Sequence, residues 1–141
     1  MADLAGKPGP RVRPEFRNIH VSQLSQYRMP LAAFVSILHR VSGALLFLVG
    51  LPFLLYLFQQ SLTSEISYEN YRAIASHWFS KLVLLALAWG YLHHFCAGIR
   101  HLLLDLDIGV GKEQGRTSAS VVLGVSLVLT LVVALKLFGA F

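Results

Sequence analysis

Hydrophobic residues gather in three long runs along the chain, and polar stretches separate them. The runs cover residues 31–58, about 79–104 and 118 to about 138. A helix needs about 20 mainly apolar residues to cross the hydrocarbon core of a bilayer, and each run reaches that length. The pattern therefore predicts an all-α integral membrane protein in which a basic segment, residues 1–29, precedes a three-helix membrane unit, residues 30–141.

Two prolines mark the first run. Pro30 stands where the first helical turn begins, a position at which its missing N–H costs nothing. Pro52 lies within the run, where a kink is tolerated if neighbouring groups satisfy the freed carbonyl. Between the runs, residues 59–77 are predicted to form a polar loop and residues 109–117 a Gly-rich charged connector.

The composition makes lipid the main solvent of this chain. Of its 141 residues, 55% are hydrophobic and 13% are charged, and the mean hydropathy is +0.62. That leaves too little polar surface to cover a soluble globule of this size. The net charge of +5 comes from lysines and arginines that flank the apolar runs, as topology-setting charges do, and no basic stripe with interleaved aromatics indicates nucleic-acid binding.

The distribution of basic residues predicts the orientation. Five precede the first run, three belong to the second loop and its flank, and two to the first loop. By the positive-inside rule the N-terminus and the second loop are cytoplasmic and the C-terminus is periplasmic. In chain order the three groups are Lys7, Arg11, Arg13, Arg17 and Arg28; Arg100, Lys112 and Arg116; and Arg72 and Lys81.

Two further features narrow the class. Cys96, the single cysteine, lies in an apolar run and has no second cysteine with which to form a disulfide or hold an iron–sulfur cluster, so it is interpreted as a packing residue. The first thirty residues lack the continuous apolar core of a signal peptide and the character of a mitochondrial transit peptide. The expected location is a bacterial inner membrane.

Polar residues inside the first two runs recur at helical spacing. In each run they stand at intervals of three, four or seven, which places them on one helix face. Because consecutive spans run antiparallel, a rise of about 1.5 Å per residue puts Arg40 about 15 Å and His94 about 16 Å from the same cytoplasmic surface. Two polar stripes can therefore face each other: Ser36, His39, Arg40 and Gly43 in the first run, and His94, Gly98 and His101 in the second.

An arginine as deep as Arg40 needs a compensating group. Its insertion costs at least about 2.5 to 3.5 kcal/mol, and no acidic residue of the predicted spans lies at its depth. A partner subunit, a haem propionate or a quinone is the expected counter-group. The alternative is that Arg40 extends to the headgroups or binds a lipid phosphate.

His94 has two interpretations. A lone transmembrane histidine is often a hydrogen-bonded packing residue. Neutral imidazole is also the usual ligand of haem iron, and Gly98, one turn away, removes a side chain where a flat macrocycle would lie. One ligand from this chain would leave the second axial position to another chain. His93 points about 100° around the helix from His94, so it is not expected to share that role.

Two motifs carry a family resemblance. Ser36-Ile-Leu-His-Arg-Val-Ser-Gly43 resembles the S-x-x-H-R-x-S-G motif of the cytochrome b556 family of succinate dehydrogenase membrane anchors. His94-Phe-Cys-Ala-Gly-Ile-Arg-His101, followed by Asp105, resembles its H-x-x-x-G-[IV]-R-H-x-x-x-D motif. The Arg13-Pro14 to Pro30 segment is similar to the family's lead-in, so the likeness covers the tail and the first two spans.

The resemblance implies the site and the partners. It makes His94 the axial ligand of haem b, with the opposite ligand supplied by a second anchor subunit, so that the three helices form half of a heterodimeric bundle. Ser36 and Arg40 match ubiquinone-binding residues, while His39, Arg40 and His101 match positions near the haem propionates. An iron–sulfur subunit and a flavoprotein would oxidise succinate on the cytoplasmic side, because this chain has no cysteine cluster and no dinucleotide fingerprint.

Some alternatives remain open at this stage. The same features suit the anchor of a menaquinol-linked fumarate reductase or a structural anchor without haem, and a b-type absorption band would separate the last case. A transporter or proton channel should carry acidic relay residues, yet no Asp, Glu, His, Lys or Arg occurs between Val41 and Gln59. The resemblance leaves the roles of Arg100 and Asp105 open, and His20 stands where this chain departs from the family pattern.

Overall fold

The computed structural model describes residues 20–139, and every regular element in this range is a helix. Most of the predicted basic segment, residues 1–19, lies outside the described residues. Three continuous helical stretches, Leu31–Thr63, Trp78–Asp105 and Lys112–Leu137, are long and apolar enough to cross a membrane. The prediction of an all-α, three-span membrane protein is therefore confirmed. The elements are α1 (Val21–Gln26), α2 (Leu31–Leu45), η1 (Leu46–Gly50), α3 (Leu51–Thr63), α4 (Glu65–Ser76), α5 (Trp78–Asp105) and α6 (Lys112–Leu137).

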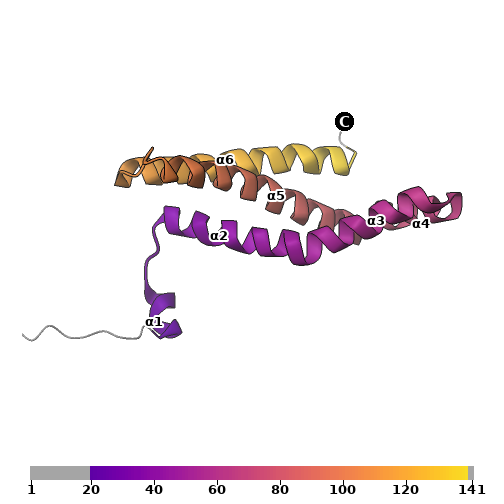
Figure 1. Cartoon of the computed structure of the whole chain (residues 1–141), viewed down its shortest axis with the longest axis horizontal. Coiled ribbons are helices and arrows are strands. Elements are labelled where there is room, and N and C mark those ends of the chain that lie inside the picture. Colours follow the sequence, from indigo (N-terminus) through magenta and orange to yellow (C-terminus); the bar gives the residue numbers. More distant parts are fainter. Residues whose placement is uncertain (1–19, 140–141) are drawn as a thin grey trace, which may run out of the picture.

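The first membrane helix contains one π-helical turn, η1, directly before Pro52. Proline has no N–H to donate to the carbonyl four residues earlier, and its ring clashes with that carbonyl. The backbone widens here, and the N–H of Leu51 donates to the carbonyl of Leu46, five residues back. Figure 1 shows the helix bending where α2 passes into α3. The expected kink at Pro52 therefore takes the form of a π-bulge.

The helices extend beyond the apolar runs. The prediction that residues 59–77 and 109–117 form loops was therefore wrong, because much of each segment is helical. α3 continues to Thr63, and α4 occupies most of the expected 59–77 loop. The hydroxyl of Ser64 accepts from the N–H of Ser67, whose own hydroxyl accepts from the N–H of Ser64, so a capping box starts α4 without any apolar pattern. Similarly, α6 starts at Lys112, leaving a short connector in which Asp107 and Gly109 have φ of 59° and 82°.

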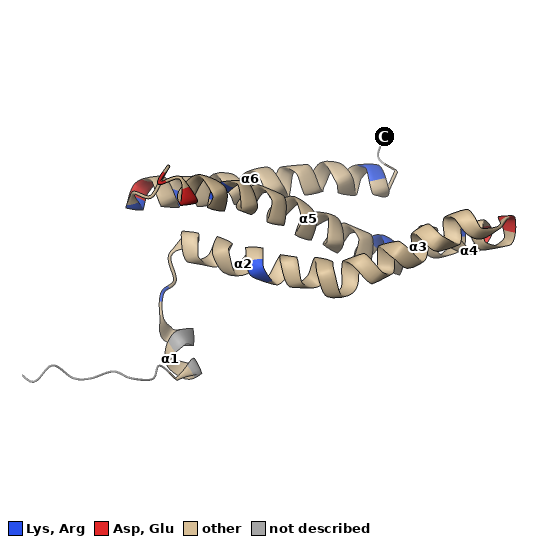
Figure 2. Ribbon diagram, viewed as in Figure 1, with Lys and Arg blue, Asp and Glu red and all other residues tan. Residues whose placement is uncertain are grey.

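α5 is the central helix, antiparallel to both α2 and α6, which pack against it (Figure 1). Its buried face carries Gly90, His93, Ala97 and Arg100, and small residues such as Gly90 and Ala97 allow close helix approach. Most large apolar side chains point outward, as expected for a surface in contact with lipid. Charged residues gather mainly at the ends of the bundle, and Arg40 is the basic exception within α2 (Figure 2).

Candidate functional site

His94 lies on α5 and is held by the backbone of α2. Its Nδ1 is 3.0 Å from the carbonyl oxygen of His39 and 3.3 Å from Oγ of Ser42. Ser42 Oγ donates to the same carbonyl at 2.9 Å. Because a carbonyl only accepts, Nδ1 of His94 is assigned the hydrogen, which leaves a lone pair on Nε2. No hydrogen bond among the described residues involves Nε2, so this nitrogen is available as a ligand.

Gly43 makes room for the His94 imidazole. A Cβ at position 43 would lie 2.8 Å from Cε1 of His94, closer than Cβ atoms approach other atoms, and 3.2 Å from Nδ1, which is a tight contact. At Gly98 the corresponding Cβ would meet His39 Nε2 at 3.6 Å, an ordinary contact. The glycine that the His94 ring requires is therefore the one opposite it on α2.

Two more histidines complete a cluster, here called the histidine cluster: His39, His94 and His101. The rings of His39 and His94 stack with centroids 4.1 Å apart and planes 16° apart, and His101 lies 5.0 Å from His39 at a tilt of 44°. All three are half-buried, at the junction between α2 and α5. In the part of the chain that is described, no group of three or more such side chains is arranged to hold a bare metal ion. Within the cluster His94 is the imidazole whose ring is held by a hydrogen bond through Nδ1, which leaves its Nε2 uncommitted.

His93, adjacent in sequence, occupies a different environment. It is fully buried in the three-helix core and stacks on Trp89 with ring centroids 5.5 Å apart. The ring lies near the backbone carbonyl of Val35, but neither ring nitrogen makes a hydrogen bond of normal geometry. His93 therefore faces the interior of this chain, whereas His94 lies at a helix junction.

Ser36 and Arg40 lie one turn apart on α2. Ser36 is half-buried and Arg40 is exposed. Neither side chain forms a hydrogen bond or ion pair with any other residue between positions 20 and 139. Neither polar group has a partner in this part of the chain, so both are free to bind another molecule. Arg40 adjoins the histidine cluster because it follows His39 in the sequence.

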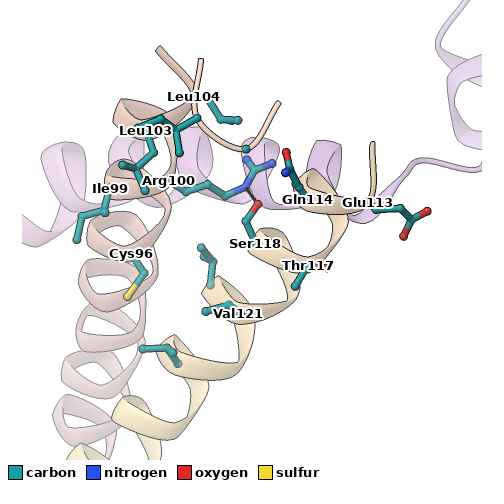
Figure 3. Close-up of a pocket in the computed structure, with 14 residues that line it drawn as sticks. Cys96, Ile99, Arg100, Leu103, Leu104, Glu113, Gln114, Thr117, Ser118 and Val121 are labelled. Carbon is teal, nitrogen blue, oxygen red and sulfur yellow. Dashed lines mark hydrogen bonds between the residues drawn. The ribbon is translucent and has the colours of Figure 1, made fainter. Parts of the chain in front are cut away.

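Arg100 is the polar residue whose setting the sequence did not predict. It was counted among the charges that set topology, yet it is only 7% exposed between α5 and α6. Its Nε donates to Ser118 Oγ at 2.9 Å (Figure 3). A terminal N–H of Arg100 also donates to the carbonyl of Gly115 at 3.4 Å. The small residues at 115 and 118, three apart on α6, are the sequence signal that could have revealed this contact.

The remaining polar residues of the motifs are peripheral in the structure. Asp105 ends α5 and is exposed. His20 is exposed, and its Nδ1 lies 2.9 Å from Ser22 Oγ. His77 precedes α5, and its Nδ1 accepts from the N–H of Phe79 at 3.3 Å. These contacts lie at the ends of helices, and none of them connects to the histidine cluster.

The fold and the site thus define a three-span membrane protein with a histidine cluster between its first two spans. Residues 16–133 match the family of succinate dehydrogenase/fumarate reductase transmembrane subunits, and the chain belongs to this family. A relative from Coxiella burnetii is 36% identical over 74% of this chain and 84% of its own length. Relatives from Rickettsia prowazekii (30% identical; 77% and 83% covered) and Paracoccus denitrificans (29%; 82% and 88%) are similar. Each is named succinate dehydrogenase cytochrome b556 subunit.

Proposed function

We propose that this chain holds haem b together with a second anchor subunit and forms part of the site where ubiquinone receives the electrons of succinate. The observation that carries the proposal is the orientation of His94. Its Nδ1 hydrogen is directed to the His39 carbonyl, which fixes the ring and leaves Nε2 as the ligand atom. Histidine ligands in proteins commonly donate their other N–H in this way.

The residues fit a haem shared between two chains. His94 is half-buried at the junction of α2 and α5, so a flat group can approach it from outside this chain. His94 is the ligand that this chain supplies, and the second axial ligand belongs to the partner. His39 and His101 lie beside His94 and are suited to donate hydrogen bonds to propionates, as is Arg40. When bound, the haem supplies a one-electron carrier beside the quinone site.

Ser36 and Arg40 are assigned to the quinone. The Ser36 hydroxyl donates a hydrogen bond to a quinone carbonyl. The Arg40 guanidinium stabilises the negative charge that develops on that oxygen as electrons arrive, an effect that is large in a site sheltered from water. Electrons come from outside this chain, since its lone cysteine cannot hold a cluster. An iron–sulfur subunit and a flavoprotein subunit on the cytoplasmic side are the proposed partners.

The assignment is tested by purifying the tagged chain from its own membrane in mild detergent. The expected result is a complex with a second small hydrophobic subunit, an iron–sulfur subunit and a flavoprotein, whose reduced-minus-oxidised spectrum has b-type bands. A complex with the same subunits but no such bands would identify a structural anchor without haem. A chain that purifies alone would remove the basis for a shared site.

We also infer that the chain lies in a bacterial inner membrane with its N-terminus in the cytoplasm. Three spans and the excess of basic residues before the first span support this orientation. A reporter active only in the cytoplasm should work when fused at position 10, and one active only in the periplasm should work at position 141. The reverse pattern would contradict the topology and place the histidine cluster near the opposite surface.

Gly43→Ala should displace the His94 imidazole and lower haem content. The added Cβ would overlap Cε1 of His94, and overpacking of this kind typically costs about 1–3 kcal/mol. The matched control is Gly124→Ala on α6, where a Cβ meets no atom within 4 Å. Haem per purified complex is the measurement. Equal haem content in the two variants would show that the close approach of Gly43 to His94 does not position the ligand.

A further inference from the structure

Two cavities adjoin Arg100 on α5. One, about 760 Å³, lies between α5 and α6 and has mainly apolar walls. The other, about 970 Å³, lies where the start of α2 approaches the α5–α6 connector. Arg100, Leu104, Gly109 and Glu113 line both. The two cavities are therefore adjacent, and together they are here called the Arg100 site, with its polar end in the second cavity and its apolar end in the first.

The polar end contains a buried cation to which none of the described residues supplies an anionic partner. Arg100 is 7% exposed, and its two hydrogen-bond partners, the Ser118 hydroxyl and the Gly115 carbonyl, are uncharged. A guanidinium has five N–H donors, so most of them remain available. Figure 3 shows the Glu113 carboxylate directed away from Arg100, and no ion pair forms between them. A cation withdrawn from water in this way is stabilised strongly by an anionic group.

The charge around the entrance favours an anion. Arg28, Lys112 and Arg116 line the second cavity together with Arg100, and Glu113 is the acidic residue among the lining side chains. The three entrance residues are exposed, so they can reach a ligand without breaking contacts of the fold. Basic pockets between transmembrane helices on the cytoplasmic side are typical binding sites for anionic lipid headgroups.

The apolar end has the shape of a groove along two helices. Cys96 and Ile99 of α5 and Val121 and Val125 of α6 line it. These residues stand three or four apart on their helices, so the groove follows the helix axes from Arg100 toward the middle of the membrane. An apolar groove that continues from an anion-binding end matches an acyl chain attached to a phosphate, whereas a carboxylate on a partner protein would account for the polar end alone.

We propose that the Arg100 site binds one anionic phospholipid, with its phosphate between Arg100, Lys112 and Arg116 and one acyl chain in the groove. The lipid neutralises Arg100 and fills the space between α5 and α6. It thereby joins the connector, which adjoins the cytoplasmic surface, to the helix that carries the histidine cluster. This role is independent of haem and quinone binding.

The test is photocrosslinking in the assembled complex. The photoreactive residue p-benzoylphenylalanine replaces Val121, which lies in the groove, or Val128, an exposed residue of the same helix outside it. Each complex is placed in nanodiscs with equal amounts of phosphatidylglycerol and phosphatidylethanolamine, illuminated, and the chain is weighed by mass spectrometry. We expect phosphatidylglycerol to be enriched over phosphatidylethanolamine at position 121 and not at position 128.

Charge variants locate the headgroup. A basic residue near an anionic headgroup contributes about fivefold in binding, so Lys112→Gln with Arg116→Gln should lower phosphatidylglycerol crosslinking at position 121 by about 25-fold. Both side chains are exposed, which protects the fold. Arg72→Gln, an exposed residue on α4, is the matched control and should have no effect. Crosslinking at 121 to a protein subunit, to both lipids equally, or to neither would each overturn the proposal.

Discussion

Arg40→Leu is expected to lower quinone reductase activity of the assembled complex by about 10²-fold or more. The estimate follows from the usual effect of removing one group that stabilises a developing oxyanion. Arg40 is exposed on α2 and forms no ion pair within the described residues, so its cation is available to a ligand outside this chain. Leucine keeps an apolar side chain at this position and removes the cation together with its N–H donors.

The control separates catalysis from assembly. Succinate oxidation with an artificial acceptor that takes electrons from the soluble subunits should survive Arg40→Leu, because those centres lie outside this chain. Arg72→Leu, which removes an exposed cation from α4, should leave both activities unchanged. If Arg40→Leu abolishes both activities, Arg40 is needed for assembly or haem retention; if it alters neither, the quinone does not bind here.

Ser36→Ala removes a hydroxyl from the same face of α2 and should have a smaller effect, seen mainly as a higher apparent KM for quinone. A neutral hydrogen bond contributes about 0.5–1.5 kcal/mol, which is roughly a two- to tenfold change. Quinone titrations of the variant complex measure it. An unchanged KM beside a strong Arg40 effect would mean that the quinone meets the guanidinium without reaching Ser36.

The sequence was sufficient to predict the three spans because the length of an apolar run is a local property. It was not sufficient for the helix ends. α4 starts at a capping box, Ser64 and Ser67, and α6 starts among the charged residues at Lys112; hydrophobic patterning detects neither. Pro52 marked a position where a kink is tolerated, but the π-bulge that forms there depends on how neighbouring carbonyls find donors.

The sequence likewise predicted one part of the candidate site and not another. Helical spacing was enough to group His94, Gly98 and His101 on one face of α5, since it needs only the helix period. The contact of His94 with Gly43 and with the His39 carbonyl depends on the register between α2 and α5, which no single run encodes. From the sequence, Arg100 resembles a charge at the membrane surface. Its burial depends on two small residues of α6, which the pattern of its own helix does not reveal.

His94→Leu is expected to remove the haem or to abolish its low-spin spectrum, since leucine cannot ligate iron. The His39 ring lies only 4.1 Å from that of His94, so a second imidazole remains near the vacated position. The double variant His94→Leu with His39→Leu removes both and should retain no haem through this chain. Assembly is followed separately by the amount of the soluble subunits bound to the membrane.

His93→Leu provides the matched control, because it replaces a neighbouring imidazole of the same helix with the same side chain. His93 is fully buried in the core and its ring nitrogens make no hydrogen bond, so leucine should be accepted without loss of haem. Any effect of His93→Leu through packing would lower the stability of the whole complex and would therefore appear in the amount assembled.

The most direct test of the assignment is the reduced-minus-oxidised spectrum of equal amounts of assembled complex carrying His94→Leu or His93→Leu. The assignment predicts that the b-type bands are lost or shifted from their low-spin form in the His94 variant and remain at their normal position and intensity in the His93 variant. An unchanged spectrum in the His94 variant, or loss of the bands in the His93 variant alone, would contradict the proposal that His94 is the haem ligand.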